Sequence, residues 1–161
     1  MFRETAIRGA WLAEPKRYDD ERGWLVETWR EDWLDTPGLR PAAPAMSYVS
    51  ITRPGVARGP HEHRDQTDYF AFLGPSTFKV FLWDNRPGSP TVGARLTFLL
   101  GAENPGLLLV PPGVVHAYKN IGTEDGLVLN YPNRLFAGRD KREPVDEIRH
   151  EDDPDSRFRL D

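Results

Sequence analysis

Cysteine is absent from this 161-residue sequence. The absence excludes disulfide bonds and thiolate metal sites, so any metal must be held by histidine and carboxylate side chains. Long hydrophobic runs are also missing. Residues 1–15 lack the apolar stretch of a signal peptide, and no later segment approaches the roughly 20 apolar residues of a membrane span. We therefore expect a cytoplasmic protein with no membrane partner.

A large excess of charge of either sign is missing too. The 21 lysines and arginines against 25 aspartates and glutamates give a net charge of −4, which offers no reason to expect a nucleic-acid partner. The length suits one domain over residues 1–161, with a core at about 9–136 and a highly charged C-terminal segment at 137–161. We expect this segment to pack across the domain, or on a partner subunit, as an extended or short helical piece.

Helical periodicity is weak except around residues 30–35, and the pattern that dominates is that of short strands. Runs rich in β-branched and aromatic residues alternate with turns that contain many of the 15 prolines and 14 glycines. Even spacing of such runs is typical of an all-β sandwich or barrel. The predicted strands are 23–29, 47–51, 67–73, 78–84, 94–100, 106–111, 114–120 and 126–131.

Histidines are few, but two of the four occur one residue apart in GPHEHRDQTDYF, residues 59–70. In an extended segment, His61 and His63 project to the same face, and Glu62 projects to the other. Asp68 follows five residues later, and His116 follows a PPGVV turn. A β-barrel can bring such residues into one pocket. They could be metal ligands, a catalytic base with a helper, or surface polar residues.

The spacing of these residues resembles the two signature motifs of the cupin superfamily. The first contains H-x-H and a carboxylate between two glycines, and the second contains P-x-G, a histidine and an asparagine. The matching residues here are Gly55, His61, His63, Asp68 and Gly74, then Gly106, Pro111, Gly113, His116 and Asn120. The sequence departs in having aspartate for glutamate. The resemblance implies a cupin double-stranded β-helix, or jelly-roll barrel, with short helical segments.

Within that superfamily the sequence resembles the dTDP-4-dehydrorhamnose 3,5-epimerases. The matching segments, in the same order, are EPKRYDDERGWLVETW (14–29), VARGPHEH (56–63), DNRPGSPTVGA (84–94), VPPGVVHAY (110–118) and EIRHEDDP (147–154). This resemblance implies a homodimeric isomerase that acts on a nucleotide-linked 4-keto-6-deoxy sugar. The implied roles are nucleotide binding by Arg22 and Glu27, sugar-nucleotide binding by Arg58, proton removal by His61, and pocket lining or substrate contact by His116 and Asn120.

Several positions depart from the family pattern. Asp68 stands where the family has a lysine, and His63 where it has a glutamine-like residue. The catalytic tyrosine of the family aligns with Leu129, and Tyr131, two residues on and so on the same strand face, is the candidate replacement. The family's C-terminal acid, which orients the base, is missing or is replaced from another part of the charged tail.

These departures leave the chemistry open. Removal of a proton beside a ketone needs a base and a group that holds the enolate oxygen, yet Asp68 would repel an enolate. A divalent metal (Zn, Fe, Mn or Ni) on His61, His63, Asp68 and His116 would offset that charge as a Lewis acid. A metal on the His61 nitrogen would prevent it from acting as base. The alternatives are therefore a metal-dependent cupin enzyme of other activity, or a non-catalytic cupin that binds a sugar nucleotide.

Overall fold

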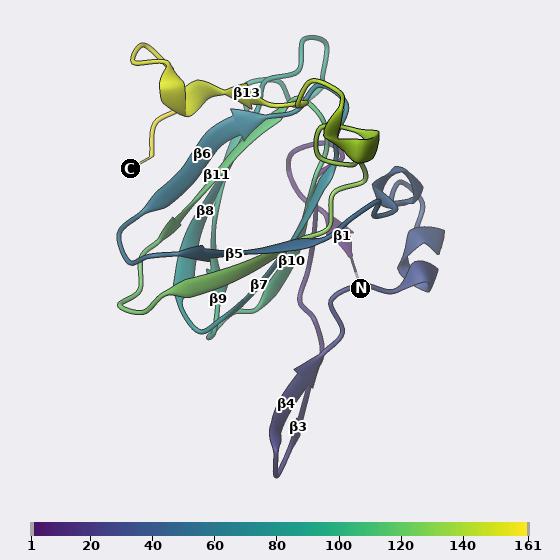
Figure 1. The fold of residues 1–161 in the computed structure, drawn as a ribbon, viewed down its shortest axis with the longest axis vertical. Helices are drawn as coiled ribbons and strands as arrows, with labels where there is room; N and C mark the ends of the chain where they lie inside the picture. The colour runs from purple at the N-terminus through teal and green to yellow at the C-terminus, as the bar shows by residue number, and fades with distance from the viewer. Residues whose placement is uncertain (1, 161) are drawn as a thin grey trace.

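Two antiparallel β-sheets pack face to face in the computed structural model, which describes residues 2–160 (Figure 1). The six-stranded sheet has the order β1 (Arg3–Glu4), β2 (Trp11–Ala13), β10 (Gly106–Val110), β7 (Asp68–Gly74), β12 (Gly126–Asn130) and β5 (Tyr48–Thr52). The five-stranded sheet has the order β13 (Ile148–Arg149), β6 (Ala57–Glu62), β11 (Val114–Asn120), β8 (Thr77–Asp84) and β9 (Arg95–Gly101). The predicted all-β jelly roll is confirmed.

Short 3₁₀ helices and one separate hairpin complete the fold. The helices are η1 (Glu31–Asp35), η2 (Arg40–Ala42), η3 (Arg139–Lys141) and η4 (His150–Asp152). The hairpin pairs β3 (Arg17–Asp20) with β4 (Gly23–Val26) and projects away from the two sheets (Figure 1). None of the helices among residues 2–160 is long and apolar enough to cross a membrane.

Alternation along the strands divides the apolar residues between two sides. On β8, Phe78, Val80 and Leu82 enter the main core between the sheets, whereas Phe81 and Trp83 point to the outer side. A strand has a side-chain period of two, so both faces of β8 are apolar and both must be covered. The C-terminal segment covers the outer face with Phe158, which is only 8% exposed.

Every predicted strand coincides with a strand of the structure, whereas β6 is not among the predicted strands because it lacks a regular alternation. Gly59 and Pro60 interrupt its pattern, and the glycine has a local reason. Gly59 has φ +77°, and a Cβ there would lie 2.6 Å from the carbonyl oxygen of His116. The register between β6 and β11 shifts at this point, and His61 pairs with His116. The glycine thus allows the close approach that aligns the two histidine-bearing strands.

The turn after β8 is built around one carboxylate. Asp84, whose side chain is fully buried, accepts hydrogen bonds from Arg86 Nε at 2.8 Å, Ser89 Oγ at 2.6 Å and Thr91 Oγ1 at 2.6 Å. Burial alone would raise the pKa of Asp84, but the hydrogen bonds from Arg86, Ser89 and Thr91 lower it well below the usual range. The DNRPGSPTVGA segment therefore forms a rigid, ionised turn.

Asp84→Asn is expected to weaken the acid dependence of stability. A carboxyl with a depressed folded-state pKa stabilises the fold above its unfolded pKa of about 4 and loses that contribution as the pH falls through the folded value. The variant should therefore be less stable than wild type at pH 7, and the difference should shrink below about pH 4. Urea unfolding at pH 7 and at about pH 2.5 measures both values, and an equal difference at both would contradict this account of the turn.

Candidate active site

Three histidines meet at one end of the space between the sheets. His61 comes from β6, His63 follows that strand, and His116 lies on β11. One nitrogen from each ring lies within 4.8 Å of the other two, and the rings of His61 and His116 are 4.5 Å apart between centroids. The predicted meeting of residues far apart in the sequence is therefore present. His63 and His116 are buried, and the side chain of His61 is 16% exposed.

Asp68, at the start of β7, joins this histidine cluster from the opposite sheet. Its Oδ2 lies 2.9 Å from His63 Nε2 and 3.1 Å from His116 Nε2. Its Oδ1 accepts hydrogen bonds from the side-chain amides of Gln66 and Asn130, both at 2.9 Å. Burial alone would raise the pKa of Asp68, but the contacts with His116 and His63 lower it far below its usual range. Asp68 is thus a buried anion.

His63 supplies a positive charge beside that anion. Both of its ring nitrogens face acceptors, because Nε2 contacts the Asp68 carboxylate and Nδ1 contacts the backbone carbonyl of Asp146. Burial lowers the pKa of His63, but the hydrogen bond and the charge of Asp68 outweigh it and raise the pKa to about 9. In the absence of a metal, His63 is therefore an imidazolium at neutral pH.

His116, unlike His63, is uncharged. Burial, and then the neighbouring His61, lower its pKa, so the ring is neutral at pH 7. Its Nδ1 lies 3.1 Å from the carbonyl of Val114 and donates to it, which leaves the lone pair on Nε2. Nε2 is buried and has no hydrogen-bond partner within residues 2–160, since the nearby Asp68 oxygen is not aligned for one.

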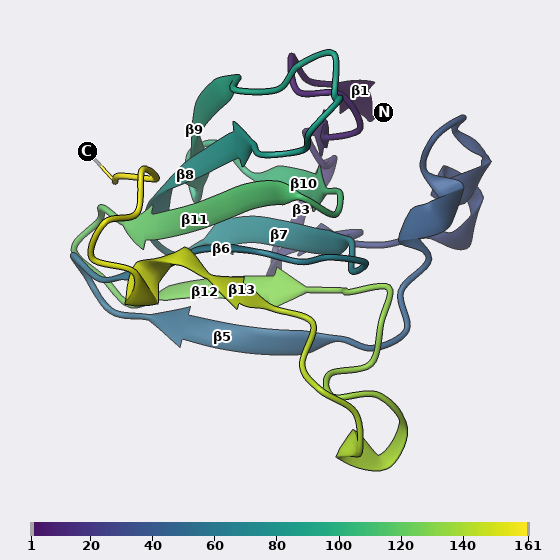
Figure 2. The same cartoon turned by 90° about the horizontal axis from the view of Figure 1, so that it is seen from above.

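Two glutamates from the C-terminal segment face His61. Glu147 Oε1 and Glu151 Oε1 each lie 3.7 Å from His61 Nδ1. The segment reaches this position because β13 pairs with β6, with Arg149 opposite His61. The sequence left open whether an acid at this position is missing or comes from another part of the tail, and the structure places two acids of the tail beside His61. The segment was expected to pack across the domain or on a partner subunit, and in this chain it runs alongside β6 of the five-stranded sheet (Figure 2).

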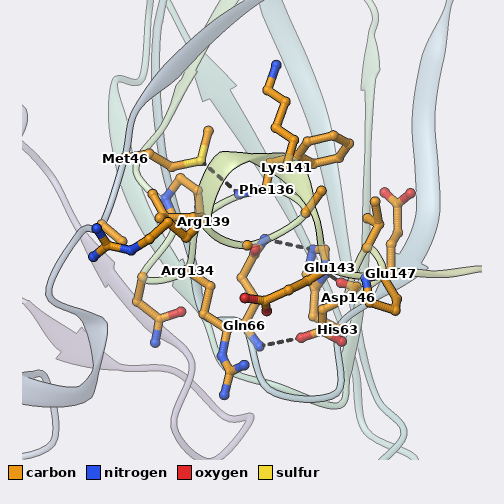
Figure 3. A pocket seen from close by; sticks show the side chains of 18 of the residues that line it. Met46, His63, Gln66, Arg134, Phe136, Arg139, Lys141, Glu143, Asp146 and Glu147 are labelled. Atoms are coloured by element: carbon orange, nitrogen blue, oxygen red, sulfur yellow. Dashed lines mark hydrogen bonds between the residues drawn. The ribbon is translucent and has the colours of Figure 1, made fainter.

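The histidine cluster opens into a cavity of about 750 Å³ whose lining includes Tyr48, His61, His63, Gln66 and the loop at 132–147 (Figure 3). In Figure 3, His63, Asp146 and Glu147 lie together on one side of this cavity. A second cavity of about 350 Å³ shares Tyr48, His61 and Glu147 with the first and adds Arg58 and Tyr118. His61 is therefore the histidine that faces both spaces.

Comparisons with known proteins agree with this geometry. A family model described as dTDP-4-dehydrorhamnose 3,5-epimerase matches residues 4–142. The probable low-salt glycan biosynthesis epimerase Agl13 of Haloferax volcanii is 38% identical over 125 residues, which is 77% of each chain. A dTDP-4-dehydrorhamnose 3,5-epimerase of Methanothermobacter thermautotrophicus is 30% identical over 81% of this chain and 69% of its own. This chain belongs to the dTDP-4-dehydrorhamnose 3,5-epimerase family.

Solved structures extend the agreement to the fold. The dTDP sugar isomerase of Desulfovibrio desulfuricans is 26% identical and superposes with a TM-score of 0.77, over 99% of this chain and 93% of that one. The dTDP-4-dehydrorhamnose 3,5-epimerase of Sulfolobus tokodaii is 28% identical, with a TM-score of 0.69, over 81% of this chain and 74% of that one. The family resemblance predicted from the sequence is confirmed, and with it the isomerase class.

The side chain that faces the histidine cluster from β12 is not a tyrosine. Tyr131 and Leu129 point to the outer face of the six-stranded sheet, where Tyr131 hydrogen-bonds Thr28 at 2.7 Å. Val128 and Asn130 point inward instead, and Asn130 reaches Asp68. Tyr131 therefore does not face His61, and its expected catalytic role is wrong. The side chain on that strand that meets the histidine cluster is Asn130.

Tyr48 was missed by the sequence analysis. It lies on the edge strand β5, and its hydroxyl accepts a hydrogen bond from Asn130 Nδ2 at 2.8 Å. Burial, followed by the charge of Asp68, raises the pKa of Tyr48 to about 12, so its hydroxyl keeps its proton at pH 7. No local signal marks this tyrosine, because SYVSI has the pattern of any half-exposed strand.

Asn120 was expected to contact substrate, but it stabilises the fold instead. The side chain is fully buried, accepts from Ser76 Oγ at 2.6 Å and donates to the carbonyls of Thr52 and Glu124. It lines neither cavity beside His61. The expectation is corrected because this asparagine lies at the end of β11, where it links the end of β5 to the turns that contain Ser76 and Glu124.

Arg22 and Glu27 also lie apart from the histidines of their own chain. Arg22 is at the tip of the β3–β4 hairpin, with its side chain 83% exposed, and it pairs with Asp20. Glu27 pairs with Arg30 at 2.8 Å. Arg58, by contrast, lines the smaller cavity beside His61, as does Arg149, and the Arg58 guanidinium donates to Thr52 Oγ1 at 3.0 Å.

Proposed function

We propose that this chain is an epimerase of a dTDP-linked 4-keto-6-deoxyhexose, in which His61 removes the proton from a carbon next to the keto group. The observation that carries the proposal is the placement of His61 between two carboxylates, Glu147 and Glu151, at the meeting point of two cavities. Family membership supports the substrate class. The cytoplasmic location expected from the sequence stays a prediction.

The glutamates suit His61 to act as a base. With the proton held on Nδ1 toward the carboxylates, the lone pair is on Nε2, and the imidazolium that forms on proton uptake is stabilised by negative charge. Glu151 Oε2 is buried and has no hydrogen-bond partner within residues 2–160. Glu151 can therefore accept a hydrogen bond from His61 after the imidazole has taken up a proton from the substrate. The 3.7 Å separations are within the range that tightens when substrate binds.

The enolate needs donors in place of the family lysine, whose position is taken by Asp68 in this chain. Tyr48, Arg58 and Tyr118 line the same cavity as His61. Burial raises the pKa of Tyr118 as it does that of Tyr48, so both phenols are neutral donors. Each well-placed donor to a developing oxyanion contributes about 3–4 kcal/mol to catalysis. These three groups would therefore stabilise the negative charge on the enolate oxygen, which the Asp68 carboxylate would repel.

Solvent-deuterium uptake tests this function. The protein is incubated in D₂O with a dTDP-4-keto-6-deoxyhexose, and label is sought at C3 and C5 by NMR. Label at either carbon supports the proposal. Binding of dTDP without any exchange would favour a non-catalytic binding protein.

A divalent cation at the histidine cluster is a second candidate, favoured by the buried lone pair on His116 Nε2. His61, His63, His116 and Asp68 would hold it, and the cluster's donor set fits Zn, Fe, Mn or Ni. Such a cation would polarise a carbonyl as a Lewis acid. The cation would also supply the positive charge beside Asp68 that the protonated His63 ring supplies in its absence.

Elemental analysis of untagged protein decides between the two candidates. The metal-centre candidate predicts about one metal per chain and its loss in His116→Gln, with a lower melting temperature after chelation. Metal-free wild-type protein that catalyses full exchange would exclude it.

We also propose a homodimer in which the hairpin of one subunit completes the site of the other. The β3–β4 hairpin projects from the two sheets (Figure 1). Arg22 lies in its turn, and the hairpin also exposes Tyr18, Trp24 and Leu25. Exposed aromatic residues on a two-stranded ribbon are typical of a surface that another chain covers. An Arg22 that binds a nucleotide would then do so in the partner's site.

Arg22→Ala is expected to lower dTDP affinity about tenfold or more, because a charge-assisted hydrogen bond contributes about 1.5–3 kcal/mol. Calorimetry measures the affinity, with the exposed Arg53→Ala as the control that changes nothing. Co-refolding Arg22→Ala with His61→Ala subunits tests the action in trans. Mixed dimers contain one intact site only if Arg22 and His61 come from different chains, so unrescued exchange would contradict the proposal.

A further inference from the structure

Glu62 stands between the two cluster histidines in sequence but has no part in the reaction proposed above. Alternation along β6 turns its side chain to the outer face, away from His61 and His63. There it is buried, with an exposed fraction of only 6%. A carboxylate at such a position costs free energy unless donors satisfy it, so its contacts define what it does.

Both contacts of Glu62 are to other segments of the chain. Its Oε1 lies 2.9 Å from His150 Nε2 and accepts a hydrogen bond from Asn85 Nδ2 at 2.8 Å. Asn85 belongs to the turn after β8, and His150 begins η4. The carboxylate therefore ties the C-terminal strap, which we define as residues 143–160, to the outer face of the five-stranded sheet.

The strap carries the acids that face His61. Glu147 and Glu151 flank His150 in sequence, and Ile148 pairs with Glu62 across β13 and β6. The residues of the strap also lie beyond the part of the chain that the family model matches, residues 4–142. Glu62 is thus the group within the matched region whose buried side chain holds the centre of the strap.

The strap is also anchored to the rest of the chain near both of its ends. At the start of the strap, Asp146 accepts hydrogen bonds from the backbone N–H groups of Arg64, Asp65 and Gln66. At its end, Phe158 packs on Trp83 and on the ring of His150. These contacts hold the two ends of the strap. Between the two glutamates, the strap is held by the backbone pairing of β13 with β6 and by the contact of the Glu62 side chain with His150.

We propose that Glu62 is a positioning residue, which clamps His150 on the outer face so that Glu147 and Glu151 stay beside His61 on the inner side. The inference rests on the proposed role of His61 as base. It predicts that the clamp sets the turnover rate and leaves nucleotide binding unchanged. It also predicts that the clamp acts only through His61.

The test compares Glu62→Ala with Glu62→Gln, which keeps the acceptor oxygen for His150. In Glu62→Ala, kcat for solvent-deuterium exchange should fall about 10–100-fold with KM within threefold, since a displaced catalytic group loses rate on that scale. Glu62→Gln should retain at least a third of the rate. Folded protein is measured by near-UV circular dichroism, and exposed Glu103→Gln is the matched control.

Two further measurements separate the clamp from general stability and from the proposed function. In a His61→Ala background, Glu62→Ala should cause no additional loss of exchange rate. Amide hydrogen exchange without substrate should show lost protection over 146–152 in Glu62→Ala. An unchanged kcat in Glu62→Ala, or unchanged protection of the strap, would overturn the inference. Wild-type protein that exchanges no substrate proton would overturn the proposed function, and amide exchange would still decide whether Glu62 holds the strap.

Discussion

His61→Ala is expected to reduce solvent-deuterium uptake into a dTDP-4-keto-6-deoxyhexose by about 10²–10⁴-fold, the usual contribution of a positioned base. Glu147 and Glu151 face its Nδ1, and its ring lies at the junction of two cavities, so no other described histidine is placed to replace it. His63 has both ring nitrogens engaged, and His116 lies buried beneath His61. NMR of the product measures the rate.

The His61 variant should still fold and bind dTDP. The side chain is 16% exposed, and the two glutamates that face it keep their ion pairs with Arg149. Near-UV circular dichroism and calorimetry with dTDP check both points. An exchange rate equal to that of wild type, in a variant that binds dTDP normally, would remove His61 from the mechanism.

Asp68→Ala is expected to lower the free energy of unfolding by about 3–5 kcal/mol, the usual loss when one partner of a buried ion pair is removed. The carboxylate accepts from Gln66 and Asn130 and contacts two histidines. Without it, the His63 imidazolium is left buried without its counter-charge. Since domains of this kind are stable by about 5–15 kcal/mol, the loss is a large share of the total.

Urea unfolding at pH 7 measures the effect of Asp68→Ala. Asp68→Asn keeps an acceptor for Gln66 and Asn130 and should fall between wild type and the alanine variant. Asp125→Ala, at an exposed turn, is the control and should stay within about 0.5 kcal/mol of wild type. A loss below about 1 kcal/mol in Asp68→Ala would show that the buried charges are not coupled as described.

Strand positions and the histidine cluster were predictable because both depend on local rules. Alternation and turn residues located every strand with a regular pattern, and the i, i+2 spacing placed His61 and His63 on one face. The second motif then added His116. In each case the physical constraint acts over a few residues, so the sequence contains it in full.

The face of β12 was not predictable in the same way. LVLNY is apolar on both faces because one face enters the core and the other packs beneath the N-terminal segment and η1. Packing between the layers decides which face points inward: Val128 enters the main core, and burial alternates along the strand, so Asn130 points inward as well. Asn130, and neither Leu129 nor Tyr131, meets Asp68 for that reason. A strand that is covered on both faces has apolar residues at successive positions, so its sequence does not show which side chains point into the core.

By itself the sequence determined the jelly roll, the family and the three histidines with Asp68. Tertiary structure alone decided which other groups surround the histidine cluster: Glu147 and Glu151 from the strap, Tyr48 from an edge strand, and Asn130 from β12. The division has a physical cause. Side-chain direction within a strand is fixed by neighbouring residues, whereas the path of a charged tail is fixed by partners such as Glu62 and Trp83 that are distant in sequence.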